Sequence, residues 1–146
     1  MTIPPIDLNA IMIAAQVTRV LNVIHRVAYA LISPELTVLY ASPNFTNALS
    51  EPTHNLFGRR LEDLVWEFVG VEENLMAILN GRLPFLALER VNREMSGGHT
   101  LYLDMNVTPF KNPDMESGLL LIVEDVTEQA VMEQRLTQSR NELLLV

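Results

Sequence analysis

A regular alternation of side-chain type between residues 100 and 108 constrains the fold more than any other feature of the chain. One set of alternate positions is apolar: Leu101, Leu103, Met105 and Val107. The other set carries polar groups: Tyr102, Asp104, Asn106 and Thr108. Because successive side chains of a strand point to opposite faces, this period of two predicts a strand with one buried face. The next strand, Gly118–Val123, lacks alternation, so we expect both of its faces to be covered, the outer one by the N-terminal helix.

Strand-forming residues predict three further strands. Two of them, Val27–Ile32 and Thr37–Ala41, flank Ser33-Pro34-Glu35-Leu36, where the proline favours a turn. The third is Phe85–Arg93, and Ser96-Gly97-Gly98-His99 then predicts a hairpin turn into the alternating strand. The chain therefore has the pattern of an antiparallel sheet.

Short helices are predicted between the second and third strands. Ser42-Pro43 is a typical helix start, and the segments expected to be helical are Asn44–Leu49, Glu62–Phe68 and Glu72–Asn80. Gly81 follows the last of them and favours its termination.

Two longer helices with a heptad pattern are predicted at the ends of the chain. The first spans Asp7–Val27, with apolar residues spaced four and three apart at Ile6, Ala10, Ile13, Val17, Val20, Ile24 and Val27. It either packs on its own domain or pairs with a second copy of itself. The second spans Glu128–Val146, with Met132, Leu136, Leu143 and Val146 in the same spacing and Ser139 at the intervening position. Its narrow apolar stripe predicts a helix that projects and pairs, and Asp125-Val126-Thr127-Glu128 predicts a capping box at its start.

Composition limits the function classes. The chain has 146 residues, a length that suits one domain. Its net charge of −8 argues against nucleic acid or an anionic membrane as the main partner. It has no cysteine, which excludes disulfides, thiolate metal sites and cysteine nucleophiles. The longest apolar stretches fall far short of the roughly 20 residues of a membrane helix, and the first residues lack the basic start of a signal peptide. We expect a soluble, cytoplasmic protein.

Three stretches resemble the PAS family of sensory domains over Val23 to Thr127. They are Tyr40-Ala41-Ser42-Pro43-Asn44-Phe45, Leu56-Phe57-Gly58-Arg59-Arg60-Leu61-Glu62-Asp63-Leu64 and Asp125-Val126-Thr127. The resemblance implies an α+β fold, a five-stranded antiparallel sheet with helices on one face enclosing a pocket. It also implies flanking helices that form dimers and pass signals to kinase or cyclase modules. The corresponding division is residues 1–26 as cap helix, 27–127 as PAS core and 128–146 as signalling helix.

The resemblance also raises the question of a cofactor. Haem-binding members need a histidine on the helix before the third strand, where residues 71–83 have none. His54 is the candidate axial ligand, whereas His25 on the N-terminal helix and His99 in a hairpin turn are expected to be solvated or partly packed. The cysteine adduct of light-sensing members is excluded, but flavin stacked on Trp66 without a covalent bond is not. Candidate pocket residues are Asn44, Trp66, Leu79, Leu83, Leu101, Leu103 and Met105, which would equally fill an empty core. The cofactor therefore stays unknown, with none favoured.

Charged residues give little sign of catalysis. Neighbours in Glu62-Asp63 and Glu72-Glu73 point about 100° apart on a helix and cannot act as a carboxylate pair. Either Glu89 or Arg90 must face inward if its strand is regular, which requires a partner or ligand, unless the strand is bulged or at an edge. The loose pair of Tyr102 and Asp104 lies on a polar face. We therefore predict that the chain is not an enzyme.

The predicted function is that of a sensor module in signal transduction, as in two-component systems. Its expected homodimer interface comprises Ile13, Val17, Val20, Ile24, Met132, Leu136 and Leu143. Asp125 and Thr127 would relay the signal to an effector outside this chain, such as a histidine kinase or a nucleotide cyclase. The alternative is a domain whose main role is to hold flavin, haem or an apolar metabolite.

Overall fold

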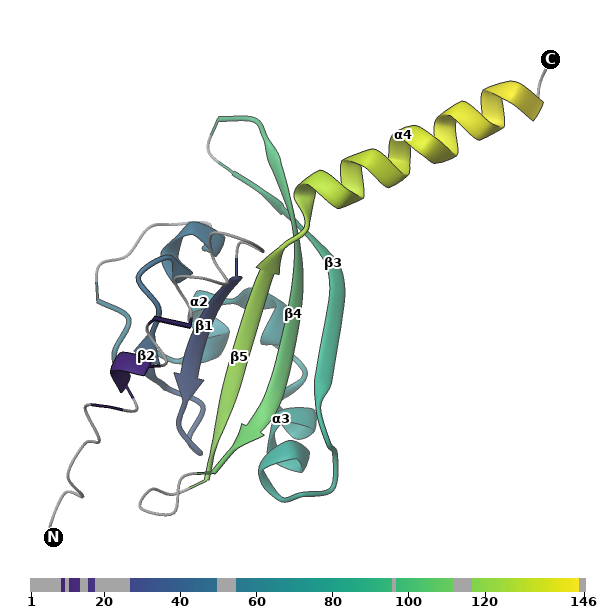
Figure 1. Ribbon diagram of the computed structural model, residues 1–146. Coiled ribbons are helices and arrows are strands. Elements are labelled where there is room, and N and C mark those ends of the chain that lie inside the picture. Colours follow the sequence, from purple (N-terminus) through teal and green to yellow (C-terminus); the bar gives the residue numbers. More distant parts are fainter. Residues whose placement is uncertain are drawn as a thin grey trace, which may run out of the picture.

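The computed structural model describes residues 9, 11–13, 16–17, 27–49, 55–95, 97–111 and 117–144. Within them, one antiparallel sheet has the strand order β2-β1-β5-β4-β3 (Figure 1). The strands are β1 (Val27–Ile32), β2 (Val38–Ala41), β3 (Leu86–Glu94), β4 (Thr100–Phe110) and β5 (Gly118–Asp125). All five were predicted, and the predicted bounds differ from these by at most two residues.

Short helices between β2 and β3 cover one face of the sheet (Figure 1). They are the 3₁₀ turn η1 (Phe45–Ala48), the helix α2 (Leu61–Leu64), the 3₁₀ turn η2 (Trp66–Phe68) and the helix α3 (Glu72–Leu79). The last element, α4 (Thr127–Leu144), leaves the end of β5 and projects away from the sheet. None of the helices in the described part of the chain is long and apolar enough to cross a membrane.

The predicted N-terminal helix is described at residues 9, 11–13 and 16–17, which are helical and exposed. Val20, Ile24 and His25 lie outside the described residues. One expectation for this helix was wrong, because Val27, the last residue of its predicted heptad pattern, is the first residue of β1. There it pairs with Glu124 of β5.

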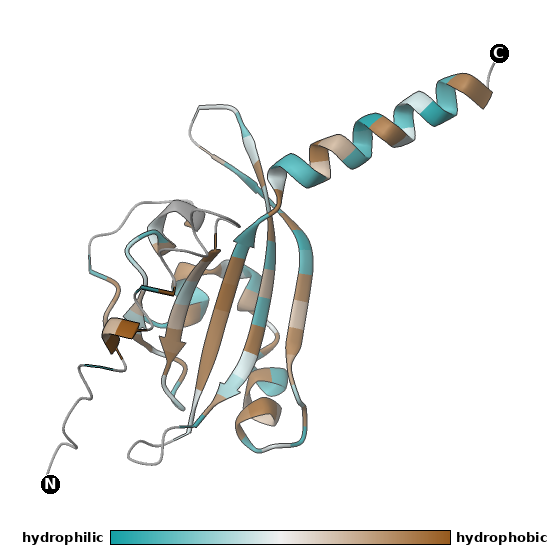
Figure 2. Ribbon diagram, viewed as in Figure 1, coloured by the Kyte–Doolittle hydropathy of each residue, from teal (hydrophilic) through white to brown (hydrophobic). Residues whose placement is uncertain are grey.

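The core lies between the sheet and the short helices. Alternate residues of β4 from Leu103 to Val107 are buried as predicted, together with alternate residues of β1 and β5. Figure 2 shows hydrophilic and hydrophobic residues alternating along β4. The largest fully buried side chains are Phe45, Phe68, Ile32, Leu61, Leu75, Ile78, Leu103, Met105, Leu119, Leu121, Val38 and Val65. Leu120 and Ile122 on the other face of β5 are half-buried, and the N-terminal helix predicted to cover them lies largely outside the described residues.

The edge of the sheet at β2 is closed by the stretch around Gly58. The Gly58 N–H donates to the Val38 carbonyl at 2.8 Å, and the Val38 N–H donates to the Arg59 carbonyl at 2.9 Å. Gly58 has φ of +78°, a conformation in which glycine avoids the steric cost of a side chain. These bonds occupy backbone groups that would otherwise leave the edge open to pairing with another strand.

Candidate functional site

The passage from β5 into α4 is fastened by a local turn. The Asp125 carboxylate accepts two hydrogen bonds from Thr127, one from its N–H at 3.0 Å and one from its hydroxyl at 2.5 Å. This arrangement is a turn between an aspartate and the residue two positions later. The side chain of Asp125 therefore sets the direction in which the helix starts.

The same passage is also tied to β4 through the backbone of Tyr102. The Tyr102 N–H donates to the Thr127 hydroxyl oxygen at 3.0 Å, and the Val126 N–H donates to the Tyr102 carbonyl at 2.8 Å. Val126 and Ala130 are buried, and the Ala130 N–H donates to the Val126 carbonyl at 2.9 Å. The first turn of α4 is thus held by apolar contact and by hydrogen bonds to the central strands.

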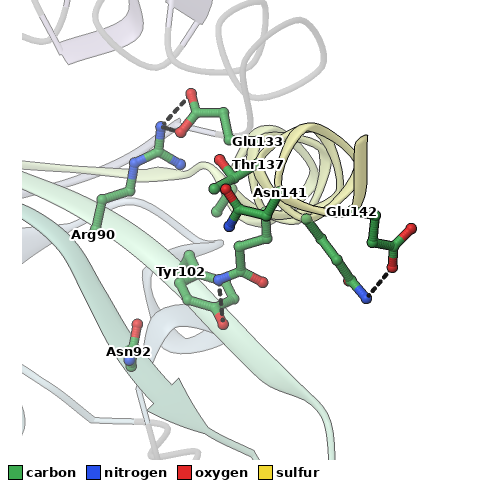
Figure 3. Close-up of a pocket in the computed structure, with 10 residues that line it drawn as sticks. Arg90, Asn92, Tyr102, Glu133, Thr137, Asn141 and Glu142 are labelled. Atoms are coloured by element: carbon green, nitrogen blue, oxygen red, sulfur yellow. Dashed lines mark hydrogen bonds and ion pairs between the residues drawn. The ribbon is translucent and has the colours of Figure 1, made fainter. Parts of the chain in front are cut away.

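A second attachment lies one turn further along α4 (Figure 3). A nitrogen of the Arg90 guanidinium is 2.8 and 2.9 Å from the two carboxylate oxygens of Glu133. The Gln134 amide donates to the Tyr102 hydroxyl at 3.3 Å. Both partners come from the outer face of the sheet, so the angle between α4 and the sheet is fixed at two points along the helix.

Arg90 reaches α4 because β3 is bulged. The pairing of β3 with β4 shifts between Leu88 and Val91, so that two residues of β3 oppose Asp104 alone. Arg90 has φ of +56°, and its N–H donates to the Asp104 carboxylate at 2.9 Å. A bulge of this kind re-aims a side chain. It resolves the question raised by Glu89 and Arg90, because both are exposed and neither faces the core.

An open groove of about 850 Å³ lies between α4 and the outer face of β3 and β4 (Figure 3). All but one of the residues that line it are of polar type, and they are Arg90, Asn92, Tyr102, Ala130, Glu133, Gln134, Thr137, Gln138, Asn141 and Glu142. A second groove of about 320 Å³ lies beside β2 and is lined by residues 38–43, 46 and 55–57.

Residues predicted for a cofactor pocket lie in three different places. Leu103 and Met105 are fully buried, and Leu79, Leu83 and Leu101 are packed against that core. Asn44 is half-buried, and its amide donates to the Val27 carbonyl at 2.9 Å. Trp66 is 61 % exposed, so its expected interior position was wrong. The 3₁₀ turn η2 directs Phe68, not Trp66, into the core.

The predicted haem ligand, His54, lies outside the described residues, and His99 is exposed in the turn before β4. Among the residues that the structure describes, no three histidine, cysteine or acidic side chains come together as a metal site.

A buried ion pair was missed by the sequence analysis. The Arg93 guanidinium of β3 bonds to the Glu67 carboxylate of η2, and the two side chains are 2 % and 7 % exposed. The signal for it was available, because a bulge at Glu89 and Arg90 shifts the alternation and turns Arg93 toward the core. A buried charge requires a partner, and Glu67 supplies it.

The pKa of the Glu72 carboxylate lies below its ordinary value. The pKa of Glu72, at the start of α3, is lowered by a hydrogen bond from its own N–H and by another from the Gly70 N–H. A hydrogen bond with Glu62 and the nearby charge of Arg60 lower it further.

Comparison with known proteins identifies the class. The family model described as PAS fold matches residues 25–131, so the chain belongs to the PAS-fold family. Among curated proteins, none matches the chain significantly.

Solved structures share the architecture at low sequence identity. A sensory box histidine kinase/response regulator from Burkholderia thailandensis is 20 % identical, with a TM-score of 0.55 over 88 % of this chain and 98 % of that one. A sensory box sensor histidine kinase from Vibrio cholerae is 16 % identical, with a TM-score of 0.52 over 82 % and 96 %. The phage VqmA–DPO complex is 17 % identical, with a TM-score of 0.57 over 94 % and 61 %. These likenesses show the fold.

Proposed function

We propose that this PAS domain is a non-catalytic sensor module that forms a homodimer and relays a change in its sheet, through Asp125 and Thr127, into α4. The effector at the far end would be a histidine kinase or a nucleotide cyclase, and the setting the cytoplasm. The observation that carries the proposal is the position of the apolar residues of α4. They lie on the face of the helix that its own domain leaves uncovered.

This placement follows from helix geometry. At about 100° per residue, Met132, Leu136 and Leu143 lie about 200–240° around the axis from Ala130. Most side chains of α4 that contact the sheet or line the groove, among them Gln134 and Thr137, lie within about 60° of Ala130, and the groove-lining Gln138 and Glu142 lie at about 80° and 120°. We call Met132, Leu136, Ser139 and Leu143 the α4 seam; its three apolar members are 59 %, 69 % and 75 % exposed.

Burial of the seam requires a partner. The spacing of four, three and four residues is that of a coiled coil, whose apolar positions pack against a second helix. The N-terminal residues Ile13 and Val17 are also exposed, and we assign them to the same dimer. Both features fit a module whose two end helices contact a second copy.

The relay is supported by the double attachment of the helix. A displacement of β4 or β5 moves Tyr102 and Asp125, and both are bonded to Thr127. Because the first turn of α4 is rigidly held, such a displacement rotates the helix as a body. That is the kind of small rigid-body change by which packed elements transmit a signal.

Sedimentation velocity tests the dimer. Leu136→Glu places a charge in the seam and should convert the dimer to a monomer, because burying an unpaired charge is costly. Asn141→Glu adds the same charge on the opposite face and should leave the dimer intact. A Leu136→Glu protein that keeps its dimer would contradict the role of the seam.

A native mass spectrum of the protein purified without added cofactor tests the alternative function. A ligand-holding domain would carry added mass, and its pocket would become the primary site. The two grooves described above do not favour that alternative, because Leu79, Leu101 and Leu103 line neither of them. We expect a dimer of unmodified chains.

A further inference from the structure

Charged residues flank the α4 seam, and their order has a consequence for how two copies meet. With Leu136 and Leu143 at the a positions of a heptad and Met132 and Ser139 at the d positions, Glu133 and Arg140 fall at e. Glu128, Arg135 and Glu142 fall at g. All five charged side chains are exposed, so they are available to a second helix.

A parallel pair of these helices, in register, brings like charges together. In that arrangement a g residue faces the e residue five positions further along the partner. Glu128 then faces Glu133 of the second copy, and Arg135 faces Arg140. Each contact occurs twice because the pair is symmetric, so all four oppose association.

An antiparallel pair brings opposite charges together. There e residues face e residues and g residues face g residues. When Leu136 packs opposite Ser139 of the second copy, Glu133 meets Arg140 and Arg135 meets Glu142. All four contacts are then attractive, and the charges at e and g positions are what sets orientation in coiled coils.

Packing within the seam agrees with the charges. In the antiparallel arrangement each Ser139 faces a Leu136, and each Met132 faces a Leu143. The parallel arrangement would instead place Ser139 against Ser139, two small polar groups in one layer. Facing small residues with large ones fills a helix interface evenly.

We propose that the α4 seam binds a second copy of α4 in antiparallel orientation. This inference rests on the proposed function, in that it presupposes a dimer formed through the seam. The Arg90–Glu133 contact fits it, because the Glu133 carboxylate can accept a further bond from Arg140 of the second copy. The two PAS cores then lie at opposite ends of the helix pair, so Ile13 and Val17 would contact another part of the second copy and not their own counterparts.

Reversal of one charge distinguishes the two orientations by sign. Arg140→Glu turns two attractive contacts into repulsive ones in the antiparallel pair, whereas it turns two repulsive contacts into attractive ones in the parallel pair. We expect the dimer dissociation constant to rise about tenfold, the sum of small effects at two exposed pairs. Arg82→Glu, the same change at an exposed residue outside α4, should leave it unchanged.

A distance measurement gives the second readout. The chain has no cysteine, so Leu144→Cys offers a single labelling site at an exposed position in the last turn of α4, outside the seam. Residue 144 lies opposite residue 131 of the second copy in the antiparallel pair. Two spin labels are then separated by 13 residues along the axis, about 20 Å at 1.5 Å per residue, whereas in the parallel pair they lie side by side.

The outcomes separate this inference from the proposed function. A weakened dimer with a long label distance supports the antiparallel pair. A dimer that Arg140→Glu strengthens or leaves unchanged, or a short label distance, overturns the antiparallel pair and leaves the dimer standing. A wild-type chain that is monomeric at all concentrations overturns the proposed dimer itself.

Discussion

Removing one member of the Arg93–Glu67 ion pair should destabilise the fold strongly. Arg93→Met retains a long side chain but leaves the Glu67 carboxylate charged in a site where only 7 % of that side chain is exposed. Breaking a buried pair in this way costs about 3–5 kcal/mol, because the remaining charge has lost both its partner and its water. A domain has a total stability of only about 5–15 kcal/mol, so the loss is large.

Urea unfolding followed by far-ultraviolet circular dichroism measures the effect. Protein concentration must be the same for all variants, because dissociation of a dimer shifts the apparent stability. The control is Arg60→Met, which removes the exposed pair between Arg60 and Glu62, 2.7 Å apart, and should cost less than about 1 kcal/mol. The double variant Arg93→Met with Glu67→Leu should recover to within about 1 kcal/mol of the wild type, since a buried pair is often replaceable by apolar side chains.

Two results would refute this reasoning. If Arg93→Met costs no more than Arg60→Met, the guanidinium is hydrated rather than buried against the core. If the double variant is as unstable as Arg93→Met, the loss comes from packing around residue 93 and not from the stranded carboxylate.

Three other changes have equally direct expectations. Gly118→Ala would place a methyl group 2.6 Å from the Ile32 carbonyl oxygen, so thermal unfolding should report a loss of about 1–3 kcal/mol, and an unchanged melting temperature would contradict the close approach. Thr127→Val leaves the Tyr102 N–H without its acceptor and should cost about 1–3 kcal/mol of stability. Hydrogen exchange should then be faster for the amides in the first turn of α4, and the control Thr137→Val, at an exposed position, should leave their exchange rates unchanged. The lowered pKa of Glu72 means that its stabilising effect is present above the unfolded pKa and disappears as pH falls through the folded pKa. The melting temperatures of wild type and Glu72→Gln should therefore converge in acid, and a constant gap would refute the assignment.

Much of the fold could be predicted from local patterns, because each pattern has one structural solution. The alternation from Leu101 to Val107 requires a half-buried strand. Leu103, Met105 and Val107 are buried and alternate with half-buried neighbours, while Leu101, near the start of the strand, is itself half-buried. Residues of the three family-like stretches then made the whole topology predictable, including the placement of the short helices between β2 and β3.

The candidate site was predictable only at its base. Asp125 and Thr127 were recognised, but the bond between Thr127 and Tyr102 depends on the register between β4 and β5, which no local pattern encodes. A bulge at Glu89 and Arg90 was one of the predicted alternatives, but its consequence for Arg93, three residues further on, was not drawn: the bulge inverts the alternation and turns Arg93 toward the core. Trp66 shows the opposite failure. It was predicted to lie near the core, but the 3₁₀ geometry of η2 points its side chain outward.

The projection of α4 also determines how large a movement the sheet can produce at a distance. The helix has 18 residues and extends about 27 Å from its attachment at Thr127 at 1.5 Å per residue. A tilt of about 10° at the base, small enough to keep the Asp125 turn intact, would displace the far end by about 5 Å, close to one helical pitch. The Arg90–Glu133 contact lies near the base of the helix, where a tilt of this size requires only a small movement of the two side chains. If the domain relays a signal as proposed, a small rotation at the base of α4 would therefore reach a neighbouring module as a displacement of several ångströms.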